Sequence, residues 1–358
     1  MYAHERALQP LGGDNSVMTE SRNHHYIPQG YLRGFGWKRG KHHMVVVHDF
    51  QQKKTYETNT RNICAQRDFM RFEVEGRRPD WLEEEFGKLE SEAVAAIREV
   101  IRSGVFDGEN KNYILNLMAL LAVRSPEQRE NMRDFQARVA QRLMDLVLEK
   151  KERWESQISE MEEELGKPTS ATYEQVKDFH ERGEYTIEVA RERHIQTEID
   201  LYNTVLQLLG QRKWTLYLVP GDYGEFITTT RPVVIAYIDP EKVPPLFRHS
   251  PGFGLKNTEV YFPLSKHALL LGRWDGDERT ISPVNQSFVG VMNNQMIQHS
   301  YGLVLSSARE VLYHDPLMRL QWNDKLIDRF TTPPSEEDMA QFKTEHGIAG
   351  NPEARPTN

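Results

Sequence analysis

The segment NKNYILNLMALLAVR, residues 110–124, constrains the fold more than any other stretch of the chain, because it is apolar on nearly every side. A helix with this pattern has to be covered by other elements all round, so we expect it at the centre of a core. It should end before Pro126, since the residue ahead of a proline is disfavoured in the α conformation. The rest of the chain must supply the layers that cover it.

Strand patterns lie on both sides of this helical region. Alternate side chains share one face in HHMVVVHDF, residues 42–50, and the β-formers of residues 55–74 supply a partner. Short apolar or β-branched runs return in the last third as WTLYLVP, EFITTT, PVVIAYI, EVYFPLS and ALLLGRW. Helical spacing marks residues 80–101 and 188–212, and the apolar segment at 284–306 predicts a helix packed on the last strands.

These patterns predict an α+β protein with an N-terminal β-hairpin unit, a central helical layer and a C-terminal antiparallel or mixed sheet with a closing helix. The central layer includes a long charged helix over residues 127–165. We expect one globular region over residues 22–330. Its parts are a β-rich unit at 22–78, a helical part at 79–212, and strands plus a helix at 213–330. Residues 1–21 and 331–358 are polar or irregular and are expected to be flexible extensions.

Composition narrows the classes of function. The net charge of −8 argues against a protein that coats nucleic acid with its whole surface, but it is compatible with a local basic groove. The single cysteine, Cys64, allows no internal disulfide and no cysteine-based zinc site, which suits a reducing compartment. No segment has the length of a membrane span or the apolar core of a secretory signal, so we expect a cytoplasmic protein with no membrane partner.

Several blocks along the chain resemble a bacterial family known as domain of unknown function 4238. They are HHYIPQGYLRGF at 24–35, NICAQRDF at 62–69, the helix end VRSP at 123–126, then TLYLVP, FITTTRPVV and YFPLS, and an Asn-rich helix ending near SAREVLY. The resemblance covers most of residues 22–315, and its first block is the most specific. In that family the block here written FITTTRPV usually carries an acidic residue before the proline, where this chain has Thr230 and Arg231. The family implies no established reaction.

The histidine pair of the first block also resembles the opening of the His-Asn-His nucleases, where a pair of histidines precedes an aliphatic residue and a proline. In those enzymes a hairpin histidine activates water beside one divalent metal at the scissile phosphate. By that analogy His25 is the general base and His24 a metal ligand. Asn59 or Asn62 would orient the base. The third histidine of those nucleases is missing, and Asp68 would take its place.

The nuclease analogy implies a divalent metal, Mg, Mn or Zn, and nucleic acid as the substrate. A second hypothesis is a wider metal-binding cluster, because imidazole binds several metals. A hairpin would bring together His24, His25, His42, His43 and His48. The alternative interpretation is structural. In that case His25 and Tyr26 hydrogen-bond a loop carbonyl, and the core is filled at one corner by Ile27, Tyr31, Leu32 and Phe35.

An arginine supplies a further candidate contact. Arg124 follows the apolar helix and would reach a cleft there, where a guanidinium suits phosphate or carboxylate. The first functional hypothesis is therefore a metal-dependent nuclease in a bacterial defence or toxin setting, with His25, Asn62 and Arg124 as catalytic residues. The alternative hypothesis is a non-enzymatic protein-binding module, whose charged helix at residues 127–165 docks a partner protein.

Overall fold

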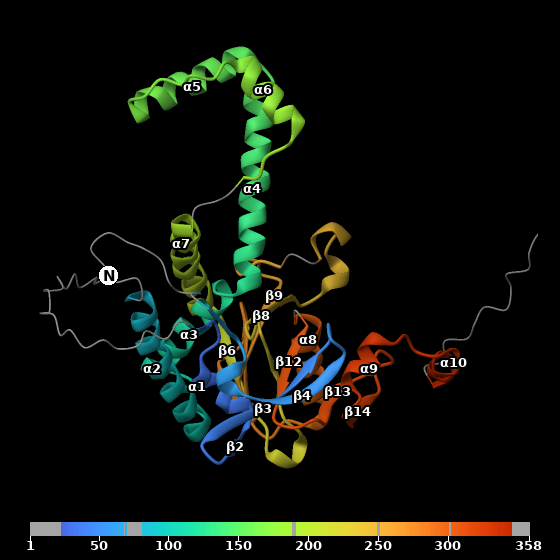
Figure 1. Ribbon diagram of the computed structural model, residues 1–358. Helices are drawn as coiled ribbons and strands as arrows, with labels where there is room; N and C mark the ends of the chain where they lie inside the picture. Colours follow the sequence, from blue (N-terminus) through green and yellow to red (C-terminus); the bar gives the residue numbers. More distant parts are fainter. Residues whose placement is uncertain are drawn as a thin grey trace, which may run out of the picture.

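The computed structural model of the chain describes residues 23–67, 69, 81–187, 191–248, 251–300 and 302–345. These residues form two five-stranded sheets with helices packed beside them (Figure 1). The predicted α+β class is confirmed.

The first sheet is the predicted C-terminal sheet. Its strand order is β11-β6-β10-β9-β8, and only the β11–β6 pairing is parallel, so the sheet is mixed. The strands span Lys213–Leu218 (β6), Val234–Tyr237 (β8), Thr258–Ser265 (β9), Ala268–Arg273 (β10) and Arg279–Ile281 (β11). Strands β9 and β10 are buried along almost their whole length, which explains their continuous apolar pattern.

The second sheet joins the two ends of the chain. Its order is β2-β3-β12-β7, and β4 pairs with β3 as the predicted hairpin partner. The strands span Trp37–Arg39 (β2), His42–Asp49 (β3), Lys54–Asn59 (β4), Thr228–Thr229 (β7) and Leu303–Ser306 (β12). Because β12 pairs antiparallel with β3, the N-terminal hairpin is completed by a strand from the last third of the chain.

Two small ladders and several short helical turns complete the N-terminal and C-terminal parts. Strand β1 (Asn23–His25) pairs with β5 (Ala65–Arg67), and β13 (Val311–His314) pairs with β14 (Leu320–Asn323). The short helices are α1 (Gln29–Leu32), η1 (Arg33–Phe35), η2 (Thr60–Asn62), η3 (Gly221–Tyr223), η4 (Pro240–Lys242) and η5 (Pro245–Phe247). The first block of the sequence thus runs from β1 through α1 to η1.

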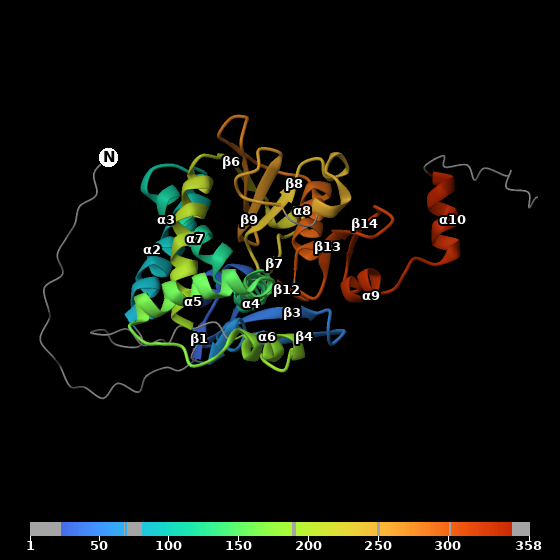
Figure 2. The same cartoon turned by 90° about the horizontal axis from the view of Figure 1, so that it is seen from above.

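Three long helices form a layer beside the sheets, as Figure 2 shows from above. They are α2 (Trp81–Ser103), α3 (Gly108–Val123) and α7 (Arg191–Gly210). Helix α3 contacts both of the others, and most of it from Ile114 onward is buried, with Ile114, Leu117 and Met118 fully enclosed. The prediction of a central buried helix is therefore confirmed. None of the helices in the described part of the chain is both long and apolar enough to cross a membrane.

The charged segment at 127–165 forms two helices in place of the expected single one. Helix α4 (Pro126–Leu148) projects from the body, and α5 (Lys151–Leu165) and α6 (Tyr173–Arg182) lie at its far end (Figure 1). The break follows from an extended backbone at Lys150. The Tyr173 hydroxyl donates to the Leu148 carbonyl at 2.8 Å and so holds the end of α4. We call α4, α5 and α6 together the arm.

Helix α8 (Gln286–Gln298) is the predicted closing helix, and Asn293 anchors it. The fully buried Asn293 side chain accepts a hydrogen bond from the Ile227 amide and donates to the carbonyls of Leu312 and Glu225. An amide satisfied in this way can lie in a core without the cost of an unpaired polar group. Two more helices follow, α9 (Leu326–Thr331) and α10 (Glu336–Glu345), the latter within the region expected to be a flexible tail.

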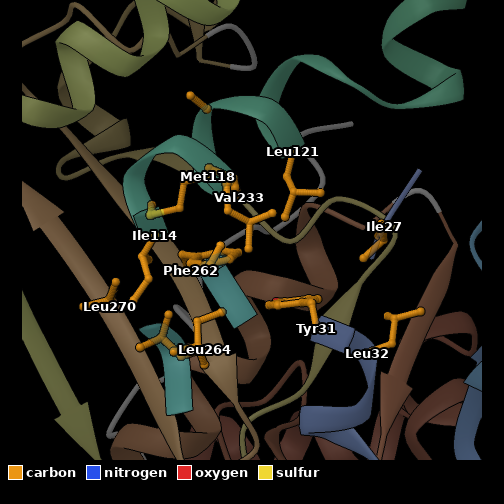
Figure 3. Close-up of a cluster of buried hydrophobic side chains, with 14 of the residues drawn as sticks. Ile27, Tyr31, Leu32, Ile114, Met118, Leu121, Val233, Phe262, Leu264 and Leu270 are labelled. Carbon is orange, nitrogen blue, oxygen red and sulfur yellow. The ribbon is translucent and has the colours of Figure 1, made fainter. Parts of the chain in front are cut away.

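Tyr31 of α1 links the helical layer to both sheets (Figure 3). Its ring stacks on Phe262 of β9, with centroids 5.4 Å apart and an interplanar angle of 10°. Its hydroxyl donates to the Pro263 carbonyl at 2.8 Å and lies 3.0 Å from the Thr228 hydroxyl of β7. The first block therefore fills the centre of the core, and the burial of Ile27, Tyr31, Leu32 and Phe35 expected from the structural interpretation is confirmed.

The buried His48 makes stability depend on pH. Its ring lies between Ser306 and Thr55, with Nε2 2.9 Å from the Ser306 Oγ atom. Burial lowers the pKa of His48 from 6.5 to about 4. The unfolded chain therefore binds the proton first as pH falls, so the stability contribution is complete above pH 6.5 and is lost toward pH 4. We expect a loss of up to about 3 kcal/mol from this residue.

Urea unfolding of the wild type and of His48→Gln between pH 4 and 7 tests this expectation. The variant should show a shallower dependence of the free energy of unfolding on pH, because its amide does not titrate. His42→Gln is the control, since His42 is exposed on the same strand. Parallel pH profiles for the wild type and His48→Gln would contradict the prediction.

Candidate functional site

A cleft of about 510 Å³ separates the first block from helix α2. Its charged and polar lining comes from three places in the sequence. They are His25, Gln29 and Arg33 in the first block, Glu90, Ser91 and Arg98 on α2, and Arg124 just after α3. The cleft therefore brings together His25 and Arg124, two residues that the sequence singles out separately.

Glycine allows the two walls of the cleft to approach each other. A Cβ atom on Gly30 of α1 would lie 3.0 Å from a methyl group of Val94 on α2, which is tighter than ordinary packing. Gly87 has open space around its Cα position, so this turn of α2 leaves room in the cleft. The close crossing of α1 and α2 sets the width of the site.

Arg124 is held rigidly in the wall of the cleft. Its backbone amide closes the last turn of α3 on Leu120, and its own backbone then leaves the helical conformation. The side chain is only 2% exposed, and its Nη2 atom donates to Glu90 Oε1 at 2.5 Å. The guanidinium also lies over the Phe86 ring, 5.3 Å from its centroid. The carboxylate of Glu90 balances the charge of the buried guanidinium, and the ring of Phe86 fixes its orientation.

His25 presents a neutral imidazole at pH 7. Burial lowers the pKa of His25, and this effect outweighs the hydrogen bonds with the backbone of Thr60 and Arg61 and the nearby charge of Glu90, which raise it. The hydrogen bonds with the backbone raise the pKa, so in them a ring N–H of His25 is the donor. The Nε2 atom is buried without a hydrogen-bond partner among the described residues. His25 thus has one ring nitrogen without a partner in the wall of the cleft.

The neighbouring His24 does not share the cleft. Successive side chains of a strand point to opposite faces, and β1 places His24 in a buried position while His25 lines the cleft. Asp68, the other proposed metal ligand, lies outside the described residues. Within the described ranges, no three His, Cys, Asp or Glu side chains gather into a possible metal site. The described residues of the cleft do not form a set of metal ligands, so no metal is assigned a part in the chemistry of this site.

The asparagines proposed to orient His25 have other surroundings. The Asn59 amide lies 2.8 Å from His42 Nδ1, and its oxygen caps η2 by accepting from the Arg61 amide. Asn62 is exposed in η2 and does not line the cleft. The η2 turn still faces His25, but it does so through the backbone of Thr60 and Arg61.

Glu90, Arg98 and Arg33 are residues of the cleft that the sequence analysis missed. The available signal was the spacing of Phe86, Glu90, Val94 and Arg98, which recur every four residues and share one face of α2. Thr230 and Arg231, where the family pattern has an acidic residue, lie elsewhere, after β7. Thr230 is buried there and Arg231 is half-buried.

The Arg124–Glu90 pair should be strongly coupled, because removing one partner leaves a buried charge without compensation. A double-mutant cycle with Arg124→Met and Glu90→Gln, measured by urea unfolding, should give a coupling free energy of about 1–3 kcal/mol. The control is the exposed pair Arg102 and Glu99 on the same helix, which should show no measurable coupling. Similar couplings for both pairs would contradict the assigned burial of Arg124.

Comparison with known proteins places this site within a family. A search of curated proteins and a search of solved structures both found no match. The profile of the family described as "Protein of unknown function (DUF4238)" matches residues 23–310. That range contains both five-stranded sheets, the helical layer and every residue that lines the cleft. The chain therefore belongs to the DUF4238 family.

Proposed function

We propose that the chain cleaves phosphodiester bonds of nucleic acid in the cleft, with His25 as the general base. The observation that supports this most is the buried and unpartnered Nε2 atom of His25 in a cleft that also contains Arg33, Arg98 and Arg124. A buried acceptor without a partner costs about 1–3 kcal/mol, and a catalytic role is one of the reasons for which such an atom is retained.

The state of His25 suits proton transfer. A neutral imidazole accepts a proton from water or from a substrate hydroxyl, and the oxygen that loses the proton attacks phosphorus. The P–O bond to the leaving nucleotide breaks, and its oxygen takes up a proton from solvent or from the imidazolium. Glu90 then favours the protonated imidazolium, because its charge raises the pKa of His25. The hydrogen bonds with the backbone of Thr60 and Arg61 hold the ring in one orientation. The base is therefore positioned before the substrate arrives.

The arginines supply the complementary charge. A guanidinium binds phosphate through two parallel N–H donors, and Arg124 is already oriented by Glu90 and Phe86. Donors that need no rearrangement stabilise charge that develops in a transition state. The biological setting that we propose for this activity is bacterial defence or a toxin.

Cleavage of labelled single- and double-stranded DNA and RNA, with Mg, Mn or Zn and with EDTA, tests the proposal. His25→Ala should lower the cleavage rate by about 100-fold or more, because general-base catalysis contributes at least that much. Added imidazole should restore part of the rate, which a loss of folding would not allow. His42→Ala is the exposed control and should keep full activity. No cleavage under any condition, or full cleavage by His25→Ala, would contradict the proposal.

A second candidate function, protein binding, is favoured by the surface of the arm. Four apolar side chains of α4 recur every three or four residues and are each at least 40% exposed. They are Phe135 at 55%, Val139 at 40%, Leu143 at 57% and Leu146 at 48%. An exposed apolar stripe of this kind marks a binding surface. Arg138 and Arg142 flank the stripe. The acidic helix α5 carries Trp154, Ile158 and Met161 at similar spacing, so a second copy of the chain offers a complementary helix.

Sedimentation equilibrium of the purified chain tests self-association through the arm. The wild type should form dimers at high concentration, and Leu143→Glu should shift the equilibrium to monomer, because it places a charge in the apolar stripe. Gln141→Glu adds the same charge to another face of α4 and should leave the dimer unchanged. A wild-type chain that stays monomeric at every concentration would contradict this candidate.

A further inference from the structure

We propose that Arg33, Arg98 and His43 form a second phosphate subsite beside the cleft, so that the groove along α2 holds two phosphates of one nucleic-acid strand. This inference rests on the proposed function for the identity of the ligand. It adds a second phosphate contact next to the His25 cleft, made by Arg33 and Arg98 of the shared lining together with His43.

The two hollows adjoin each other. A second hollow of about 280 Å³ lies next to the cleft and is lined by His43 of β3, Ser265 of β9 and residues of α1 and α2. Both hollows share Gly30, Arg33, Val94 and Arg98. A ligand in the cleft can therefore extend past the crossing of α1 and α2 into the second hollow.

The second hollow carries positive charge that its described surroundings do not neutralise. Arg33 and Arg98 are both exposed, and the described contact of Arg33 is with the neutral Gln29 at 3.1 Å. Among the described residues no carboxylate forms an ion pair with either arginine. The pKa of His43 is lowered by its burial and by the charges of Arg33, Lys38 and Arg98, so cations converge on this imidazole. In a chain with a net charge of −8, such a local excess of cations favours an anionic ligand.

The spacing of the subsites selects the kind of anion. Glu90, which holds Arg124, and Arg98 lie eight residues apart on α2, which corresponds to about 12 Å along the helix axis. One phosphate cannot reach both ends, and the contiguous phosphates of a nucleoside triphosphate are shorter than this spacing. Non-adjacent phosphates of one strand, with at least one further phosphate between them, can occupy both ends. The groove therefore fits the backbone of a single strand.

Binding of a short fluorescent single-stranded oligonucleotide, DNA or RNA, to the full chain tests the subsite. The measurements use the His25→Ala chain in EDTA, so cleavage does not interfere. Arg33→Gln with Arg98→Gln should weaken binding about tenfold at low salt. The slope of log affinity against log salt should fall by about 0.7, because the double variant removes one phosphate contact and each contact on a single strand contributes about 0.7. The matched controls are Lys88→Gln and Arg102→Gln, exposed cations of α2 that pair with Glu85 and Glu99, and these should change neither quantity.

The outcomes separate this inference from the proposed function. Binding that depends on Arg33 and Arg98, in a chain that never cleaves, would support the subsite and remove only the catalytic proposal. Equal affinity and salt slope for the double variant and its parent, or no binding of any oligonucleotide, would overturn the subsite. Unlabelled adenosine triphosphate and inorganic triphosphate serve as competitors. Each competitor is compared with unlabelled oligonucleotide at the same total concentration of phosphate. If either displaces the labelled strand equally well, the site binds small polyphosphates and the assignment to a strand is wrong.

Discussion

The packing of Tyr31 in the core is the interaction on which the rest of the structure depends. Its ring stacks on Phe262, and its hydroxyl bonds the carbonyl of Pro263 and contacts Thr228. A buried aromatic with a satisfied hydroxyl contributes a large apolar area without an unpaired polar group. Gly30 immediately precedes Tyr31, so the same packing presses α1 against α2 and defines the cleft.

The electrostatics of the site differ from those of the chain as a whole. The net charge of −8 favours a protein that repels polyanions, but Arg33, Arg98 and Arg124 meet in one groove with Glu90 as the acidic residue of its lining. Local charge governs binding at short range, because salt screens distant charges within about 8–10 Å. The first cleft combines this field with an imidazole that burial keeps neutral. The proposed chemistry at an anionic substrate rests on that combination.

Much of the fold could be predicted because its patterns are local. The central helix α3 and the strands β9 and β10 follow directly from apolar runs that need cover. The division of the charged segment into α4 and α5 could not be predicted, since it accompanies a contact between Tyr173 and Leu148. In the site, His25 and Arg124 were predicted from residue type. Glu90 was not assigned to the site because a glutamate on a helix is usually exposed, and only the burial of Arg124 beside it gives it a partner.

The sequence by itself determined the class of the fold, the central position of α3 and the importance of the first block. These follow from periodicity and from the burial that large apolar side chains require. The tertiary structure decided which residues meet. It paired β3 with β12, brought His25 and Arg124 into one cleft, and set Arg124 against Glu90. Such meetings depend on contacts between segments far apart in the chain, and no local pattern encodes the distance between them.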